Sequence, residues 1–211
     1  PAPRTLVLRF AHLTDLHIQP ERGADQGVAA CLRAVQALPD APELVVTGGD
    51  LIMDSYDTPF DRSKSLWDLF TGTVRRECGL PVQHTLGNHD IFGWNKPKSK
   101  TTGSEPQWGK KWALEMLGLA KPYHRFTKAG WRFIVLDSVA PFGDTGYQAR
   151  LDDEQMDWLK GELASDTSTP TVVVSHIPIL TVTALSADEK ARTQATRFSE
   201  VHADGLAIHE M

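Results

Sequence analysis

An alternation of short apolar runs with segments of helical periodicity constrains the fold of this chain most strongly. Four apolar runs have the length of a strand: residues 6–13, 44–47, 80–86 and 171–174. Segments with hydrophobic residues at helical spacing accompany them: residues 25–38, 64–79, 105–118 and 151–164. A hairpin with its turn at Ala129 and Gly130 is predicted over residues 123–138. This alternation indicates the α/β class, in which helices cover the faces of sheets.

Polar side chains follow each apolar run, at the point where the expected strand ends. In chain order they are Asp15, His17, Asp50, Asn88, His89 and His176. Ligands of α/β sheets bind outside the carboxyl ends of the strands, and these ends converge when the strands are neighbours. Each residue alone has an ordinary explanation as a turn or strand-end residue. Their joint arrangement predicts one site.

The chemistry of these residues favours a metal ion as the ligand. Asp15 and His17 are two residues apart, so they point to the same face of an extended segment. Gly48 and Gly49 let the backbone turn sharply and bring Asp50 close to other segments. Carboxylate, amide and imidazole ligands suit Mn, Fe or Zn, and the set contains no thiolate. We therefore expect a catalytic metal site rather than a structural zinc site.

The charge balance argues against one class of partner. The 211 residues carry a formal net charge of -5, whereas sequence-independent binding to DNA or RNA requires a basic face, so we expect no nucleic acid polymer. No apolar run approaches the roughly 20 residues of a membrane span, and we expect a soluble protein. The chain begins at Pro1 rather than Met, so prior removal of a leader stays open. The compartment, cytoplasmic or periplasmic, and the oligomeric state stay open too.

Four short motifs carry a resemblance to a known family. They are DLH at 15–17, GGDL at 48–51, GNHD at 87–90 and VVSHIP at 173–178. Together and in this order they resemble the calcineurin-like metallophosphoesterase superfamily, and the likeness covers most of the chain. Residues 123–138 and 151–163 look like the branch that includes bacterial class III cyclic nucleotide phosphodiesterases. Purple acid phosphatases have a ligating tyrosine where this chain has Met53, which argues against that branch.

The resemblance implies a fold and a departure from it. The implied fold is a four-layer α-β-β-α sandwich of two mixed sheets flanked by helices, in a single domain over residues 1–211. Members of the family normally finish with a strand that ends in GHxH, whose histidines complete the metal sites. This motif does not occur here, and the sequence ends at Met211. We therefore expect a C-terminally truncated domain that lacks the final strand or strands.

The resemblance also implies roles for the strand-end residues. Asp15 and His17 would bind one metal ion, Asn88 and His176 a second, and Asp50 would bridge both. A bridging hydroxide would attack phosphorus in line with the leaving oxygen. His89 would protonate the leaving alkoxide, with Asp90 as the candidate for orienting its ring. The complete protein would hold two divalent ions (Mn, Fe or Zn), and this chain, without the GHxH pair, one or none.

His202 and His209 could be proposed as substitutes for the missing histidine pair. They are seven residues apart, on one face of an expected helix, and upstream of the position of the motif. We interpret both as surface histidines.

Residues 93–111 form the most distinctive insert. Their Gly, Pro, Ser and Thr content predicts an irregular, solvated loop. The alternative is a lid over the site, in which Trp94 stacks on a base or covers an apolar group and a lysine such as Lys96 meets phosphate.

Two functions follow from these observations. The leading one is a metal-dependent phosphoesterase, and specifically a phosphodiesterase on a small substrate such as a cyclic nucleotide, a choice of substrate that rests on resemblance alone. The alternative is a non-catalytic interaction module or an inactive fragment on the same fold. His89 favours the enzyme, because a scaffold has no use for a non-ligating imidazole beside Asn88.

Overall fold

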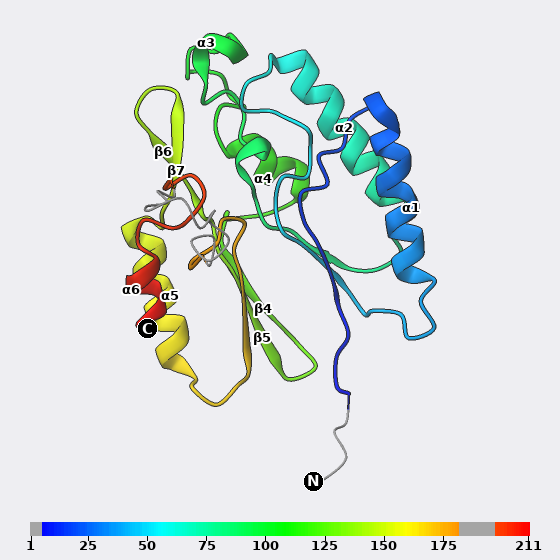
Figure 1. The fold of residues 1–211 in the computed structure, drawn as a ribbon, viewed down its shortest axis with the longest axis vertical. Helices are drawn as coiled ribbons and strands as arrows, with labels where there is room; N and C mark the ends of the chain where they lie inside the picture. Colours follow the sequence, from blue (N-terminus) through cyan, green and yellow to red (C-terminus); the bar gives the residue numbers. More distant parts are fainter. Residues whose placement is uncertain (1–5, 182–196) are drawn as a thin grey trace, which may run out of the picture.

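The computed structural model describes residues 6–181 and 197–211 of the chain, and within these ranges the strands form two three-stranded sheets and a separate hairpin (Figure 1). The first sheet is parallel, in the order β1 (Ala11–Leu13), β2 (Val45–Thr47), β3 (Val82–Gln83). In the second sheet β4 (His124–Lys128) is antiparallel to β5 (Trp131–Val135), which is parallel to β8 (Thr171–Val174). The hairpin consists of β6 (Val139–Phe142) and β7 (Gly146–Ala149).

Helices cover the outer faces of both sheets. Those on the first sheet are α1 (Ala24–Gln36), α2 (Phe60–Glu77) and α4 (Lys111–Leu117), which share one hydrophobic cluster. Those on the second sheet are α5 (Asp153–Ser165) and the short α6 (Gly205–His209), which overlap in Figure 1 and contribute to one hydrophobic cluster. The described residues also include short helical turns: η1 (Glu21–Gly23), η2 (Asn88–Asp90) and α3 (Lys96–Ser99).

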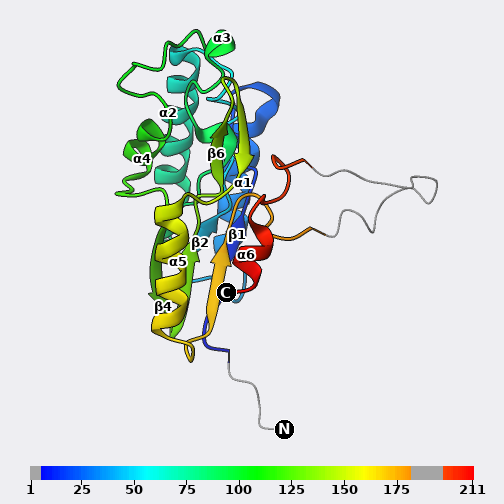
Figure 2. The ribbon, with the colours of Figure 1, turned by 90° about the vertical axis from the view of Figure 1, so that its left-hand side faces the viewer.

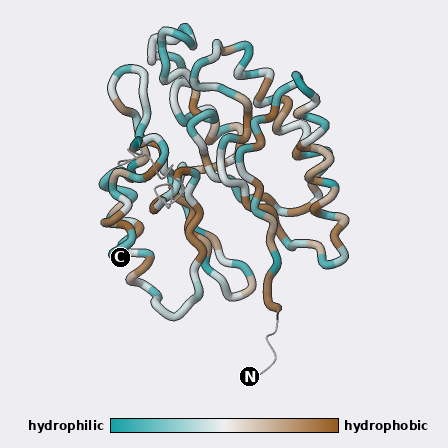
Figure 3. The backbone as a smooth tube through the Cα atoms, in the orientation of Figure 1, coloured by the Kyte–Doolittle hydropathy of each residue, from teal (hydrophilic) through white to brown (hydrophobic). Residues whose placement is uncertain are grey.

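The alternation of side chains along β5 explains the layering. Phe133 and Val135 face Val46 of the first sheet, so one apolar cluster fills the space between the two sheets. Ile134, on the opposite face, packs with Leu159 of α5. Figure 2 shows the resulting layers edge on, and Figure 3 shows hydrophobic residues along the strands. The predicted α/β sandwich is confirmed, although the first sheet is parallel throughout its described strands rather than mixed.

Local signals account for two of the elements. Ala129 and Gly130 both have positive φ, of 50° and 80°, as a tight hairpin turn between β4 and β5 requires. Asp152 caps α5, because its carboxylate accepts a hydrogen bond from the backbone N–H of Gln155 at 2.7 Å. The Gln155 side chain reaches instead to the backbone of Asp137, with which it makes two hydrogen bonds. It therefore ties the helix to the end of β5.

Three predicted elements are shorter than expected, and of the run 80–86 only Val82–Gln83 forms a strand. The run 6–13 forms a strand only from Ala11 onward, where pairing with β2 begins, and Leu6 and Val7 are 65% and 55% exposed. In the segment 105–118 the helix begins only at Lys111. Among the described residues, no helix combines the length and apolar character needed to cross a bilayer.

Candidate metal centre

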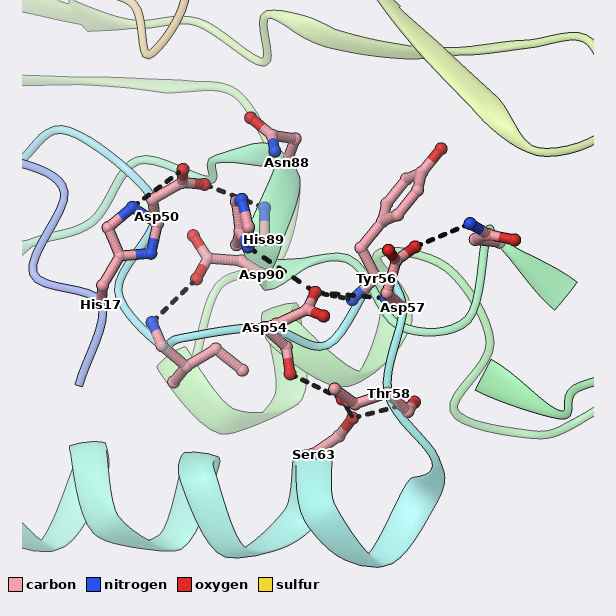
Figure 4. A network of polar contacts seen from close by, with 12 residues as sticks. His17, Asp50, Asp54, Tyr56, Asp57, Thr58, Ser63, Asn88, His89 and Asp90 are labelled. Carbon is pink, nitrogen blue, oxygen red and sulfur yellow. Dashed lines mark hydrogen bonds and ion pairs between the residues drawn. The ribbon is translucent and has the colours of Figure 1, made fainter. Parts of the chain in front are cut away.

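Side chains from four strand ends meet at one place, with Asp50 at its centre. The Asp50 carboxylate has Oδ2 3.6 Å from His17 Nε2 and Oδ1 3.5 Å from His176 Nε2. Oδ1 also accepts a hydrogen bond of 2.9 Å from the backbone N–H of His89 (Figure 4). His176 follows β8 of the second sheet, whereas the other residues follow strands of the first. The predicted convergence is therefore found, and it joins the two sheets.

The backbone at the centre is held in an unusual conformation. Asp15, His17 and Asp50 have φ of 54°, 43° and 51°, in the left-handed region that residues other than glycine rarely adopt. Such residues cost about 1–3 kcal/mol each and persist where the surroundings fix them. Here the N–H groups of Asp15 and His17 donate to the carbonyl oxygens of Gly49 and Asp50, both at 3.0 Å. These hydrogen bonds hold the strained backbone, and with it the side chains of Asp15, His17 and Asp50, in a fixed arrangement.

Glycines allow the segments to approach this closely. Gly49 has φ of 93°, which provides the sharp turn expected before Asp50. Gly87 is required for a different reason, because a Cβ atom there would lie 2.2 Å from Asp50 Oδ1.

The orientation of His176 shows that the centre fits a cation. Its Nδ1 lies 2.8 Å from the carbonyl oxygen of Gly48, so Nδ1 carries the proton and donates. In the neutral ring Nε2 then has a lone pair, which faces Asn88 Oδ1 at 3.2 Å and Asp50 Oδ1 at 3.5 Å. The imidazole nitrogen, the amide oxygen and the carboxylate oxygen are then all acceptors that face one another, and a positive ion between them would be favourable. His17 Nδ1, moreover, is buried with no hydrogen-bond partner among the described residues.

The potential ligand atoms fall into two groups that share Asp50. His17, Asp50 and His89 form one group, and Asp15, Asp50 and His176 form the other, each with its atoms within 4.8 Å of one another. A shared carboxylate agrees with the bridging role implied for Asp50. The groups divide Asp15 from His17, yet His17 Nε2 also lies 3.8 Å from Asp15 Oδ1. The assignment of both to the same ion stays a prediction.

Asp90 does not orient His89 as predicted. Its carboxylate is fully buried and accepts backbone N–H groups of Leu51 and Ile52 with Oδ1, and of Gly87 with Oδ2. These contacts use both oxygens to hold the loops that carry Asp50 and Asn88. Burial, together with the nearby charge of Asp50, raises the pKa of Asp90.

Asp54, which the sequence analysis missed, lies beside His89 instead. Its Oδ1 is 3.6 Å from His89 Nδ1 and accepts the backbone N–H groups of Tyr56 and Asp57 (Figure 4). Burial lowers the pKa of His89, but the carboxylates of Asp54 and Asp50 outweigh it and raise that pKa to about 9. The only sequence signal was an acidic residue shortly after Asp50.

A cavity of about 400 Å³ opens next to the centre. Its lining includes Asn88, His89, Asp54, Tyr56, Tyr147 and Lys98. Lys98 Nζ bonds Asp57 Oδ2 at 2.6 Å, so this lysine is already paired with a carboxylate.

The insert 93–111 departs from its prediction. It contains α3, and its ends are joined by backbone hydrogen bonds between Phe92 and Gly109, so it is not irregular throughout. Trp94 is 8% exposed and packs edge-on against Tyr56, with ring centroids 6.5 Å apart. Trp94 and Lys96 line a neighbouring cavity of about 240 Å³ rather than the cavity beside His89. The alternative of a lid, with Trp94 over the site, is therefore not found in this arrangement, because the indole belongs to a core cluster.

The two C-terminal histidines also differ from each other. His209 is exposed, as predicted. His202 is 4% exposed and lies before the first residue of α6, so its interpretation as a surface histidine on the same helix is wrong. Its ring contacts Ser175, in the loop of His176, and this loop is distant from His202 in the sequence.

Comparison with known proteins agrees with this geometry. A sequence model described as calcineurin-like phosphoesterase matches residues 8–204. The chain belongs to the calcineurin-like phosphoesterase family. It is also similar to a protein of Synechococcus sp. described as a probable cyclic nucleotide phosphodiesterase, with 28% identity over 182 residues. The match covers 83% of this chain and 60% of the relative, so the chain spans about three fifths of the relative's length.

Calcineurin-like phosphoesterases are hydrolases that act on phosphate esters and typically bind divalent metal ions. The centre supplies the carboxylate and imidazole groups that such ions prefer. The residues present therefore fit the ions that the family implies.

Proposed function

We propose that this chain is the catalytic domain of a bacterial phosphodiesterase that uses two divalent ions, Mn or Fe in the first instance. The observation that carries the proposal is the position of Asp50, whose two carboxylate oxygens belong to two overlapping groups of ligand atoms. The residues that would hold the ions are Asp15, His17, Asp50, Asn88 and His176. When bound, the ions supply the charge that activates a water molecule and neutralises the phosphate oxygens.

Residues around the centre would take the other roles in the reaction. His89 would donate a proton to the leaving alkoxide, and the carboxylate of Asp54 beside it favours the protonated imidazole. Asp54 would hold the ring of His89 and stabilise its positive charge. Asp90 would position the loops of Asp50 and Asn88 through its backbone contacts.

The cavity beside His89 is where the ester group of a small substrate would lie. Its volume of about 400 Å³ suits a nucleoside-sized group, and Tyr56 and Tyr147 contribute aromatic surface. The carboxylates of Asp54 and Asp57 disfavour a polyanionic chain in this cavity. We therefore propose a small phosphodiester, with cyclic nucleotides as the first class to test because the Synechococcus relative is described by that activity.

The test is an assay of the chain after removal of metal with EDTA and addition of Mn²⁺. The proposal predicts Mn²⁺-dependent hydrolysis of bis-para-nitrophenyl phosphate and 3′,5′-cyclic AMP, with para-nitrophenyl phosphate turned over more slowly. Asp50→Asn should abolish it, and Asp157→Asn, at a carboxylate whose side chain is 82% exposed, should leave it unchanged. Bound Mn²⁺ without turnover of any ester would favour the non-catalytic module instead.

A further inference from the structure

The imidazole of His202 is buried in a part of the molecule that the proposed chemistry does not use. Its side chain has no exposed surface. Nδ1 lies 2.9 Å from Asp204 Oδ1, and Nε2 lies 3.2 Å from Ser175 Oγ. Buried polar side chains are normally hydrogen-bonded, and here both ring nitrogens have a partner. One partner comes from its own segment, and the other is the residue directly before His176.

The contacts of His202 involve residues on both sides of His176 in the sequence. The Ser175 hydroxyl, which contacts His202, donates a hydrogen bond of 2.7 Å to the carbonyl oxygen of Ile177. The backbone N–H of His202 donates to the carbonyl oxygen of Pro178 at 3.0 Å. His202 is thus linked to the residues before and after His176 without touching the His176 ring.

The opposite side of the same loop is held by the second sheet. The Ser138 hydroxyl, which follows β5, accepts the backbone N–H of Ile177 at 3.1 Å. A Cβ atom on Gly205 would lie 2.2 Å from the carbonyl oxygen of Ile179, so the start of α6 sits directly on the loop. The backbone that carries His176 therefore lies between the end of β5 and residues 198–205. We call residues 198–205 the clasp.

The clasp is itself anchored to regular structure. Asp204 Oδ2 accepts the backbone N–H of Leu151 at 2.9 Å, and Ala203 donates to the carbonyl oxygen of Ala149 in β7 at 2.8 Å. Ile208 of α6 packs in the same cluster as Leu159 of α5. The position of His202 is consequently fixed by contacts of its segment with β7 of the hairpin, with Leu151 and with α5.

We propose that His202 is a positioning residue, which holds the loop of residues 175–178 so that Nε2 of His176 faces Asp50 and Asn88. The proposal rests on the proposed function only in taking His176 as a metal ligand. The contact between His176 Nδ1 and Gly48 fixes the ring from the side of the first sheet. His202 would fix the backbone from the other side. Partners of this kind commonly change metal affinity by about 10–100-fold when they are removed.

The first test observes His176 directly, in the metal-free chain, by NMR of its ring nitrogens. Wild-type protein should show His176 protonated at Nδ1 alone, and His202→Ala should show an average of the two tautomers. His202→Gln, whose amide N–H₂ can still donate a hydrogen bond to Ser175 Oγ, should restore the wild-type pattern at least in part. The matched control is His209→Ala, at an exposed histidine of the same segment. An unchanged His176 signature in folded His202→Ala would overturn the proposal.

The second test is a double-mutant cycle on Mn²⁺ affinity, measured by calorimetry. His202→Ala should weaken binding about tenfold in the wild-type background and cause no further loss in a His176→Ala background. Equal losses in both backgrounds would indicate a general structural effect and contradict the positioning role. Should His202→Ala fail to fold, Ser175→Ala removes the same link and should give the same pattern. Wild-type protein that binds no Mn²⁺ would refute the proposed function, and the NMR comparison would then still decide the role of His202.

Discussion

His176 Nδ1 lies 2.8 Å from the carbonyl oxygen of Gly48, and this contact links the ends of β8 and β2, which belong to different sheets. A ring that donates from Nδ1 presents the lone pair of Nε2 to the centre. The ligand arrangement therefore depends on how the two sheets pack, as well as on the residues at each strand end.

Gly87→Ala is expected to disrupt the centre. The added Cβ atom would lie 2.2 Å from Asp50 Oδ1 and 2.3 Å from Asp50 N, so the backbone must move. Overpacking of this kind costs about 1–3 kcal/mol, and we expect lower Mn²⁺ affinity as well. Gly161→Ala is the control, because this glycine lies in α5 and a Cβ atom there would meet no other part of the described structure within 4 Å, so alanine should stabilise the protein by about 0.5–1 kcal/mol. Urea denaturation and calorimetry measure both effects.

The variants Asp54→Asn and Asp90→Asn should lose different properties: the first should lose activity, and the second stability and ion binding. Asp54→Asn removes the charge beside His89, so we expect kcat to fall about 10²-fold or more while Mn²⁺ affinity stays near the wild-type value. Asp90→Asn places an amide N–H₂ against backbone N–H donors, which should cost about 1–3 kcal/mol of stability and weaken ion binding. Kinetics, urea denaturation and Mn²⁺ titration on both variants separate the roles. If kcat, stability and Mn²⁺ affinity changed in the same way in both variants, Asp54 and Asp90 would not have these separate roles.

Removal of metal should lower the thermal stability of the folded chain. An ion that binds only the native state stabilises it by about 2.7 kcal/mol at a concentration one hundred times its Kd. The melting temperature should therefore rise when Mn²⁺ is added to EDTA-treated protein, and Asp50→Asn should reduce the rise. Ca²⁺ offers a comparison, because its preference for oxygen ligands suits the imidazoles of His17 and His176 poorly. An equal rise with both ions would contradict an imidazole-containing site.

His84 should make stability depend on pH below neutrality. Burial lowers the pKa of His84 to about 4, and the nearby His124 adds to the effect. The unfolded chain, with a histidine pKa of about 6.5, binds more protons than the folded chain between these values. Stability contributed by neutral His84 is therefore complete above pH 6.5 and is lost as the pH falls toward 4, by about 3 kcal/mol.

Urea denaturation at pH 7 and pH 5 checks this expectation. His84→Gln should lose less stability between these two pH values than the wild type, and the exposed His209→Gln should lose as much as the wild type. Parallel pH curves for the wild type and His84→Gln would assign the acid sensitivity to other groups.

The strand ends could be predicted because their information is local. An apolar run followed by Gly49 and Asp50, or by Gly87 and Asn88, already marks where a buried strand reaches the surface of the sheet. Since parallel strands have their carboxyl ends at the same edge, the order of the runs was sufficient to gather the polar residues of the first sheet, whereas His176 joins them through the packing of the second sheet. A local signal also predicted the hairpin turn at Ala129 and Gly130.

The surroundings of the site were decided by contacts between distant segments. Asp54 and Asp90 are both acidic and both close in sequence to ligands, and only the packing of the loops assigns Asp90 to backbone amides and Asp54 to His89. Trp94 looked like a residue of an open loop, yet Tyr56 and the rest of its cluster bury it.

His202 is the clearest example of a residue whose surroundings the tertiary structure decides. Its sequence neighbours resemble a polar surface segment, but Ser175, Pro178 and Leu151 contribute the partners that enclose it and its segment. The sequence by itself determined which residues could bind a metal, because ligand chemistry and strand periodicity are properties of short segments. The tertiary structure alone decided which groups orient those ligands, because burial and hydrogen-bond partners arise only when residues far apart in the chain pack together.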